Sequence, residues 1–382
     1  MRIGIDYTAA AQEQAGIGRY TRELVHAVLA PELASRGHDY VAFAAAGGVD
    51  PAVFDPLRAA NVQLRTLPIS DEWVARLWHR LRLPLPVELL TGKLDIFYSP
   101  NFVLPPTLPQ TRTLLTVHDL SFVHYPDHFV PRLVEYLSRV VPRSVRRADH
   151  ILADSESTRR DLIHQLDVPP DRVTVIYCGV DKRFEPTTEA GKDRAILQRY
   201  DLLERPYVLA VGTLQPRKNH VRLIQAFAAL DSDAELVIAG GRGWLYEGIL
   251  KEADKHPDCV RVLGFVDDSH LPALYRGARV FTFPSLYEGF GIPVLEAMAC
   301  GTPVVCSNAS SLPEVAGDAT LLVNPLDVSE LTLALARALE DNDLRQAMIR
   351  KGIQQSRRFT WVSAARQLLS VFETCGVAAK RP

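Results

Sequence analysis

The chain has 382 residues, enough for two domains at about 150 residues each or for three smaller ones. Its 47% hydrophobic and 23% charged residues are typical of a globular protein and exclude a disordered or collagen-like chain. Because 43 basic residues stand against 45 acidic ones, the net charge of −2 provides no global field for nucleic acid, and any anionic ligand must be bound locally.

Short apolar runs alternate with amphipathic stretches through the first half of the chain, which predicts βαβ units around a parallel sheet. Helical patterns are clearest at 17–35, 130–147 and 156–166. The strand-like runs are 2–8, 40–46, 62–67, 95–99, 112–118, 150–155 and 173–179.

This rhythm breaks at 181–206, a polar stretch with two prolines and no strand-like run, which predicts an interdomain link. Beyond this link, helices are expected between the strands and throughout the tail, 327–375. The second set of strands is expected at 207–213, 234–240, 261–266, 279–285, 302–308 and 319–325.

The predicted fold is α/β, with two facing, Rossmann-like, doubly wound parallel-sheet domains. The expected bounds are 1–180 for the N-terminal domain, 181–206 for the linker and 207–360 for the C-terminal domain. Residues 361–382 are expected to form a C-terminal helix that packs back on the N-terminal domain. Because such sheets bind ligands at the carboxyl ends of their strands, the site is expected in an interdomain cleft.

The segment 284–303 carries the most informative motif. Gly289 and Gly291 follow the end of a strand, and Pro293 falls in the first turn of the expected helix. Glycines allow the backbone to approach a ligand closely, and the free N–H groups and dipole at a helix start favour phosphate. The segment therefore predicts an anion-binding turn.

Two carboxylates flank this turn. Glu288 precedes the glycines and Glu296 lies about one turn into the helix, so the two can reach opposite parts of one extended ligand. A carboxylate is a strong acceptor for paired sugar hydroxyls, and the spacing suits a sugar, a phosphate linkage and a ribose. The alternative is that Glu296 caps or solvates the helix start, where the dipole favours acidic residues.

A basic turn follows the first strand of the second domain. Arg217 and Lys218 precede a helix expected to start near Asn219. Cations placed there can neutralise a diphosphate and stabilise the charge that develops on a leaving group. The alternative is a solvated basic turn with Asn219 as the N-cap.

Two weaker signals lie in the first half of the chain. Gly16 and Gly18 precede a helix, so the backbone there can approach an anion closely. The alternative is that the two glycines only form an ordinary turn. Because the full GxGxxG pattern is missing, nicotinamide binding is discounted. His118, at the end of strand 112–118, can contact a sugar hydroxyl or be a structural histidine. Asp154 with Ser155, at the end of the next strand, can contact the substrate or form the N-cap of helix 156–166, and the cap is the favoured interpretation.

The motif in 284–303 resembles the E-x7-E signature of the retaining family-4 glycosyltransferases, which have the GT-B architecture of two facing Rossmann-like domains. The likeness extends over nearly the whole chain and is strongest in its second half. It implies that Glu288 contacts the transferred sugar and Glu296 binds the nucleotide ribose. The backbone expected to help hold the sugar and diphosphate is that of Phe290, Gly291 and Ile292.

The same resemblance implies roles in the other motifs. Lys218 matches a lysine that grips the donor diphosphate, and His118 a histidine against the hydroxymethyl end of the sugar. Many members have an arginine straight after the strand glycine; here Thr213 follows Gly212, and Arg217 is expected to supply the second charge. The remaining residues expected to bind the donor are Gly16, Gly18, Gly212 and Thr213.

The implied activity is transfer of a hexose from a nucleotide diphosphate to an acceptor hydroxyl with retention of configuration. The segments GIGRYT and GTLQPRKN resemble the bacterial mannosyltransferase branch of surface-polysaccharide assembly, which favours GDP-mannose, followed by UDP-glucose or another hexose donor. A growing, lipid-linked glycan is the expected acceptor, with no cofactor and no metal. The alternatives are a nucleotide-sugar epimerase or hydrolase of the same architecture and a non-catalytic nucleotide-sugar-binding module.

The expected location is the cytoplasm. The five cysteines form neither a CxxC pair nor a zinc-type cluster, the N-terminus does not read as a secretory signal, and no run approaches the 18 or so apolar residues of a membrane span. The amphipathic basic segment 71–86 can rest on the anionic inner face of the plasma membrane, or pack as a core helix with a solvated face.

Overall fold

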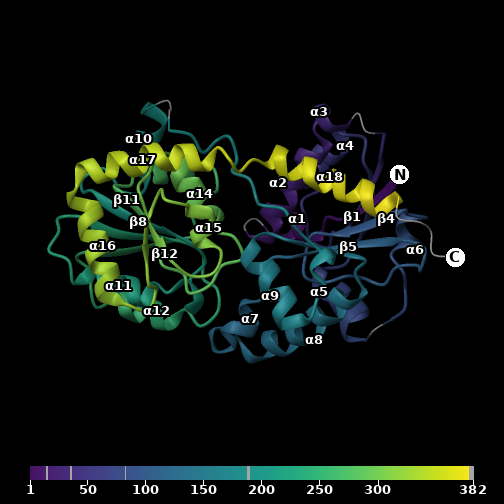
Figure 1. Ribbon diagram of the computed structural model, residues 1–382. Coiled ribbons are helices and arrows are strands. Elements are labelled where there is room, and N and C mark those ends of the chain that lie inside the picture. The colour runs from purple at the N-terminus through teal and green to yellow at the C-terminus, as the bar shows by residue number, and fades with distance from the viewer. Residues whose placement is uncertain (14–15, 35–36, 82, 187–189, 378–382) are drawn as a thin grey trace. The chain divides into compact units, whose positions relative to one another are not determined.

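The structure is a computed structural model that describes residues 1–13, 16–34, 37–81, 83–186 and 190–377. The chain divides into two compact units, each of which is described by itself (Figure 1). Unit 1 consists of Met1–Leu120, Glu135–Gly179 and Trp361–Pro382, and unit 2 of Ser121–Val134 and Val180–Thr360.

Unit 1 contains a seven-stranded parallel sheet in the order β3-β2-β1-β4-β5-β6-β7. Its strands are β1 (Arg2–Asp6), β2 (Asp39–Ala45), β3 (Gln63–Leu67), β4 (Ile96–Ser99), β5 (Arg112–Val117), β6 (His150–Ala153) and β7 (Val173–Val175). Its longer helices are α2 (Ile17–Leu29), α8 (Pro131–Arg147, of which residues 135–147 belong to this unit), α9 (Glu156–Leu166) and α18 (Trp361–Val377). Shorter ones are α1 (Thr8–Gln12), α3 (Pro31–Ala34), α4 (Asp55–Ala59), α5 (Asp71–Val74) and α6 (Glu88–Thr91), with 3-10 turns at Pro51–Phe54 and Pro170–Arg172.

Helices cover both faces of this sheet (Figure 1). All four residues of β4 are buried, as are five of the six in β5, which explains why these strands read as continuous apolar runs. α18 packs on α2, with the rings of Trp361 and Tyr20 5.9 Å apart. The strand order reverses between β1 and β4, and β5, whose carboxyl end leads to His118, pairs with β4.

Unit 2 contains a six-stranded parallel sheet in the order β10-β9-β8-β11-β12-β13. Its strands are β8 (Tyr207–Val211), β9 (Glu235–Ala239), β10 (Val260–Gly264), β11 (Val280–Phe283), β12 (Val304–Ser307) and β13 (Leu321–Val323). Its helices are α7 (Ser121–His124), α10 (Ala190–Arg199), α11 (His220–Ala228), α12 (Glu247–Ala253), α13 (Leu271–Gly277), α14 (Ile292–Ala299), α15 (Leu312–Ala316), α16 (Val328–Glu340) and α17 (Asn342–Ser356).

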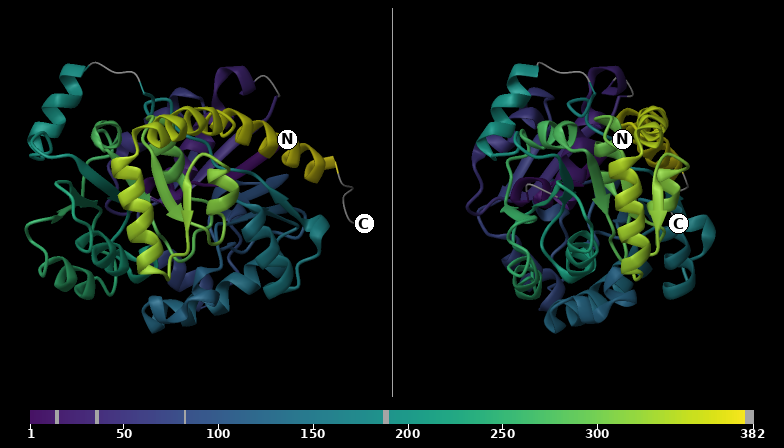
Figure 2. Two further views of the ribbon diagram at one scale, coloured as in Figure 1. Left: turned by 60° about the vertical axis from the view of Figure 1, so that its left-hand side comes forward. Right: turned by 90° about the vertical axis from the view of Figure 1, so that its left-hand side faces the viewer.

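The helices of unit 2 form two groups, with α11 packed on α16 and α14 packed on α17 (Figure 1 and Figure 2). The core beneath α11 and α16 is built from alternate residues of the central strands, among them Val208, Leu236 and Ile238, each with no exposed surface. The order of the strands reverses between β8 and β11, so their carboxyl ends lie next to each other at the edge where such sheets bind ligands.

The prediction of two doubly wound parallel sheets is confirmed, and each of the predicted strands overlaps a strand of the structure. Two local features differ from the expected organisation. Ser121–Val134 belongs to unit 2, because stacked rings hold it there: His124 lies 4.9 Å from Tyr287, and Phe129 lies 5.3 Å from Trp244. The stretch expected to be a link contains helix α10, which an ion pair joins to α13.

The segment 71–86 is not a single amphipathic helix. It contains α5 and a π-helical turn at Ala75–Arg80. Trp78 packs on Phe43 with ring centres 5.5 Å apart, as expected for a core-packed segment. Trp73 is 51% exposed, as expected for a segment that rests on a membrane surface. Among the described residues, no helix has the length and apolar character needed to cross a membrane.

Candidate active site

Two loops at the reversal point of unit 2 bring together the three charged residues predicted for its site. The loop after β8 carries Arg217 and Lys218 in the 3-10 turn Pro216–Lys218, and the loop after β11 carries Glu288. Arg217 Nη1 lies 3.0 Å from Glu288 Oε2, and Lys218 Nζ lies 2.7 Å from Oε1. The side chains are only 12%, 12% and 9% exposed, so the alternative of a solvated basic turn is wrong.

Each oxygen of the Glu288 carboxylate therefore has its own cation. Burial alone would raise the pKa of Glu288, but the charges of Arg217 and Lys218 outweigh it and lower the pKa to about 2. The Lys218 ammonium also lies 4.7 Å above the ring of Phe283, and Arg217 donates a hydrogen bond to the Tyr287 carbonyl. This arrangement keeps two cationic groups oriented at one point, where a diphosphate can bind.

Hydrogen bonds of Asn219 and of two serines after β12 fix the loops that carry the charged residues. The side-chain amide of Asn219 donates to the carbonyls of Pro284 and Pro325, at 3.0 and 2.6 Å, and makes no capping bond to α11. Asn219 is therefore a tie between loops rather than the suggested side-chain cap. Ser310 Oγ accepts from the Glu288 N–H at 2.8 Å, and Ser311 Oγ donates to the Glu288 carbonyl at 2.9 Å.

Gly212 makes room for Lys218 in this site. A Cβ at Gly212 would lie 3.4 Å from Lys218 Cε, in van der Waals contact with the lysine stem, and the φ of 153° at Gly212 favours glycine. Thr213, the next residue, is exposed at the end of the strand. Gly212 and Thr213 thus lie beside the cationic turn, in the place where the sequence predicted donor contacts.

Helix α14 begins directly after the loop that carries Glu288. Gly291 is its N-cap with φ 110°, which favours glycine, and Ile292 is its first residue. Phe290 points its ring into the core 5.8 Å from Phe359, while its carbonyl accepts from Ser311. Glu296 is 1% exposed and accepts a hydrogen bond of 2.9 Å from the Tyr275 hydroxyl, so it does not solvate the helix start.

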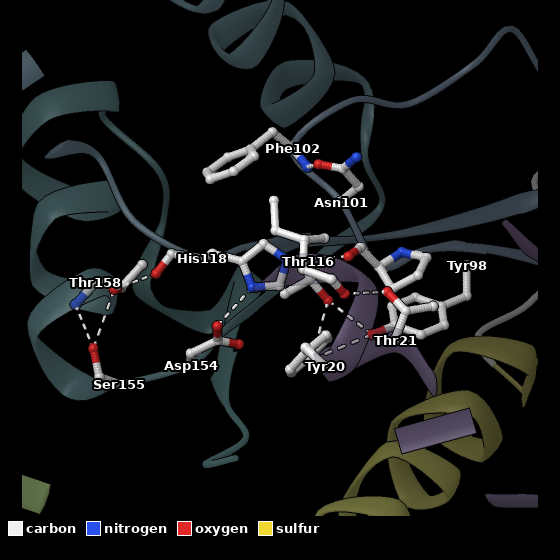
Figure 3. A network of polar contacts seen from close by, with 12 residues as sticks. Tyr20, Thr21, Tyr98, Asn101, Phe102, Thr116, His118, Asp154, Ser155 and Thr158 are labelled. Atoms are coloured by element: carbon white, nitrogen blue, oxygen red, sulfur yellow. Dashed lines mark hydrogen bonds and ion pairs between the residues drawn. The ribbon is translucent and has the colours of Figure 1, made fainter. Parts of the chain in front are cut away.

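In unit 1, His118 lies just beyond the carboxyl end of β5 and is 9% exposed (Figure 3). Its Nδ1 lies 2.6 Å from Asp154 Oδ2 and its Nε2 lies 3.1 Å from the Pro100 carbonyl. The interpretation of Asp154 as part of the helix cap is wrong, because its carboxylate pairs with His118. Ser155 alone is the cap of α9, accepting from the Thr158 N–H at 3.0 Å.

The two glycines predicted near the N-terminus differ in their surroundings. Gly16 is exposed, with φ 59° and open space where a Cβ would stand. A Cβ at Gly18 would collide with the carbonyl oxygens of Ala9 and Glu13. The close packing of α2 on α1 is therefore a sufficient structural reason for Gly18, independent of any ligand.

Replacing Gly18 with alanine is expected to lower the free energy of unfolding by about 1–3 kcal/mol, because backbone atoms must move to admit the methyl group. Urea denaturation measures this change. Gly191→Ala in α10 is the control, since a Cβ there meets open space and should be neutral or slightly stabilising. Equal stability of the two variants would contradict the packing argument.

The described residues contain no group of three or more histidine, cysteine, aspartate or glutamate side chains placed to hold a metal ion. The five cysteines are free thiols. The expectation of a reaction without a metal stays a prediction.

Comparison with known proteins identifies the class. Residues 193–355 match the family model described as glycosyl transferases group 1, and residues 15–184 match that of Glycosyltransferase Family 4. A solved structure, Anabaena Alr3699/HepE in complex with UDP and glucose, superposes with a TM-score of 0.75 at 18% identity, over 98% of this chain and all of the other. The two sheets thus form a GT-B glycosyltransferase fold.

The sequence relatives narrow the class to a family. The chain is 34% identical to O-antigen chain mannosyltransferase B of Escherichia coli, over 94% of this chain and 96% of that protein. It is 29% identical to MMP alpha-(1->4)-mannosyltransferase of Mycolicibacterium hassiacum, over 98% of each. The chain belongs to glycosyltransferase family 4, a family of retaining hexosyltransferases that use nucleotide-sugar donors, as the E-x7-E motif predicted.

Proposed function

We propose that this enzyme transfers mannose from GDP-mannose to a hydroxyl group of a growing, lipid-linked surface glycan in the cytoplasm. The site in unit 2 carries the proposal, because two cations held at one carboxylate suit a diphosphate donor. Mannose is supported by the relatives, since both mannosyltransferases named above align over nearly their whole length, 96% and 98%.

In the proposed reaction, Arg217 and Lys218 bind the donor diphosphate, Glu288 contacts the mannose and Glu296 binds the ribose. The bond between the anomeric carbon and the phosphate oxygen breaks, and its electron pair leaves with the diphosphate. The two cations and the start of α14 stabilise that charge. The acceptor oxygen bonds the anomeric carbon on the same face and gives its proton to the departing phosphate.

The roles of His118, Gly16 and Gly18 toward the donor, and those of the backbone at Phe290 to Ile292, are part of the same proposal. His118 orients the sugar rather than forming a covalent adduct with it. No metal or cofactor takes part in this scheme.

A thermal-shift series with GDP, UDP, dTDP, ADP and their hexose conjugates tests the donor. A ligand at 100 times its dissociation constant stabilises the protein by about 2.7 kcal/mol, which raises Tm by roughly 5–10 °C for a domain of this size. We expect GDP-mannose to give the largest shift. A larger shift with UDP-glucose would identify UDP-glucose as the donor in place of GDP-mannose. No shift with any nucleotide would refute the proposal.

An assay with GDP-mannose, with and without a mannan-type glycan acceptor, separates the classes of activity. The proposal requires a longer glycan and released GDP only when both substrates are present. Loss of donor without acceptor would indicate a hydrolase or epimerase, and binding without any loss of donor a non-catalytic module.

A further inference from the structure

The ring of His118 is enclosed by hydrogen-bond acceptors. A carboxylate oxygen of Asp154 faces Nδ1 at 2.6 Å, and a backbone carbonyl, that of Pro100, faces Nε2 at 3.1 Å (Figure 3). A carbonyl cannot donate, so Nε2 must carry a hydrogen. The proton between Nδ1 and Asp154 belongs on the imidazole: burial raises the pKa of Asp154 above its ordinary 3.8, but Asp154 in turn raises the pKa of His118, which starts from the higher ordinary value of 6.5. Both ring nitrogens are then protonated.

The surroundings favour this charged form. Besides Asp154, the acidic groups that act on His118 are Asp119, which follows it in the chain, and Glu13, which follows α1. Burial alone would lower the pKa of His118, but the charge and hydrogen bond of Asp154, with a further contribution from the Pro100 carbonyl, raise it above its usual value. The other titratable groups nearby are Tyr20 from α2, whose ring lies 4.7 Å from the imidazole, and Cys178, whose thiol has a raised pKa.

Residues between the end of β6 and the first turn of α9 contact both the ring and the backbone carbonyl of His118. Asp154 binds the ring, and Thr158 Oγ1 donates to the His118 carbonyl at 3.0 Å. Thr158 is itself tied to the cap residue Ser155 by a side-chain bond of 3.1 Å. The orientation of the imidazole is therefore determined by the turn that leads into α9, which the sequence favoured as a helix cap.

We infer that Asp154 is a positioning residue that keeps His118 as an imidazolium, so that His118 offers the sugar a positive charge and an N–H donor rather than a basic nitrogen. This inference rests on the proposed function, in which His118 contacts the transferred sugar. It adds that His118 accepts no proton during transfer. The sugar oxygen that meets Nε2 must accept a hydrogen bond, taking over or sharing the bond to the Pro100 carbonyl.

Nitrogen-detected NMR of the free protein tests the protonation state without any substrate, with His118→Gln to identify the signals. In the wild type we expect both ring nitrogens to be protonated at pH 7. Asp154→Asn, which keeps the shape and removes the charge, should lower the His118 pKa. Asp119→Asn is the matched control and should lower it less, because the charge of Asp119 acts on His118 more weakly than the charge and hydrogen bond of Asp154.

The pH dependence of mannosyl transfer tests the positioning role. In the wild type kcat/KM is expected to fall as the pH rises through the His118 pKa, and in Asp154→Asn this fall should move to lower pH by the shift that NMR measures. An unshifted fall would overturn the inference. So would a neutral His118 in the wild type at pH 7, a result that requires no folded variant. Absence of transfer with every nucleotide sugar would instead refute the proposed function, because the NMR result is obtained without substrate.

Discussion

Replacing Glu288 with glutamine is expected to lower the free energy of unfolding by about 3 kcal/mol at neutral pH. In the wild type the carboxylate lies between Arg217 and Lys218, and all three side chains are nearly buried. Glutamine leaves two cations side by side with no negative charge between them. The fall in the pKa of Glu288 from its ordinary 4.5 to about 2 sets the magnitude, at about 1.4 kcal/mol for each pKa unit.

The pH dependence of this difference has a definite sign. Because folding lowers the pKa of Glu288, its contribution is complete above pH 4.5 and is lost as the pH falls toward about 2. Urea denaturation of both proteins over a pH series should show a constant difference from about pH 5 upward and a shrinking one below pH 4.5.

Asp318→Asn is the control for this prediction. Asp318 also lies 2.8 Å from a lysine, Lys351, but the two side chains are 86% and 51% exposed, so its loss should matter far less. A stability loss for Glu288→Gln no larger than that of Asp318→Asn, or one that grows on acidification, would contradict the cluster as a source of stability.

The sheets could be predicted because buried parallel strands leave a strong local signal. The residues of β11 and β12 are all buried, and each strand reads as a short run of apolar residues bounded by turn residues. Helix α10 lacks such a signal, since much of its surface is exposed and its sequence is mostly polar. Its packing depends on an ion pair of 2.7 Å between Asp193 and Arg276, which no local pattern reveals.

In the site, too, contacts between residues far apart in the sequence could not be predicted from local patterns. Lys218, Arg217 and Glu288 could be selected by type and position, but their pairing across 70 residues of sequence follows from β8 and β11 being neighbours in the sheet. Asp154 stands directly before a helix, where acidic residues commonly cap, and only the pairing of β5 with β6 brings it to His118. Ser310 and Ser311 had no motif to mark them.

The segment 121–134 was predicted to belong with the strands around it, because it lies between β5 and β6 in the sequence. Its aromatic side chains instead pack on residues of unit 2. Besides the stacking of His124 on Tyr287, the indole N–H of Trp244 donates to the His128 carbonyl at 2.7 Å. Since Tyr287 directly precedes Glu288, this segment also supports the loop that carries the carboxylate.

Replacing Lys218 with alanine is expected to reduce kcat/KM for the nucleotide sugar by about 100- to 1000-fold, because one of the two charges proposed to stabilise the leaving diphosphate is lost. The stability loss should be smaller than for Glu288→Gln, because Arg217 still pairs with the carboxylate at 3.0 Å. Initial rates of sugar transfer and urea denaturation measure the two effects. Lys255→Ala, which removes an exposed lysine paired with Glu252 on α12, should leave the rate unchanged.

Lys218→Arg tests whether charge alone is sufficient. The guanidinium is larger than the ammonium and spreads its charge over a planar group on a longer side chain, so arginine does not place its charge at the same point. We expect this variant to recover at most a small part of the rate lost in Lys218→Ala. Full recovery would show that a positive charge anywhere near Glu288 is enough. A Lys218→Ala protein with the wild-type rate would remove this lysine from the site altogether.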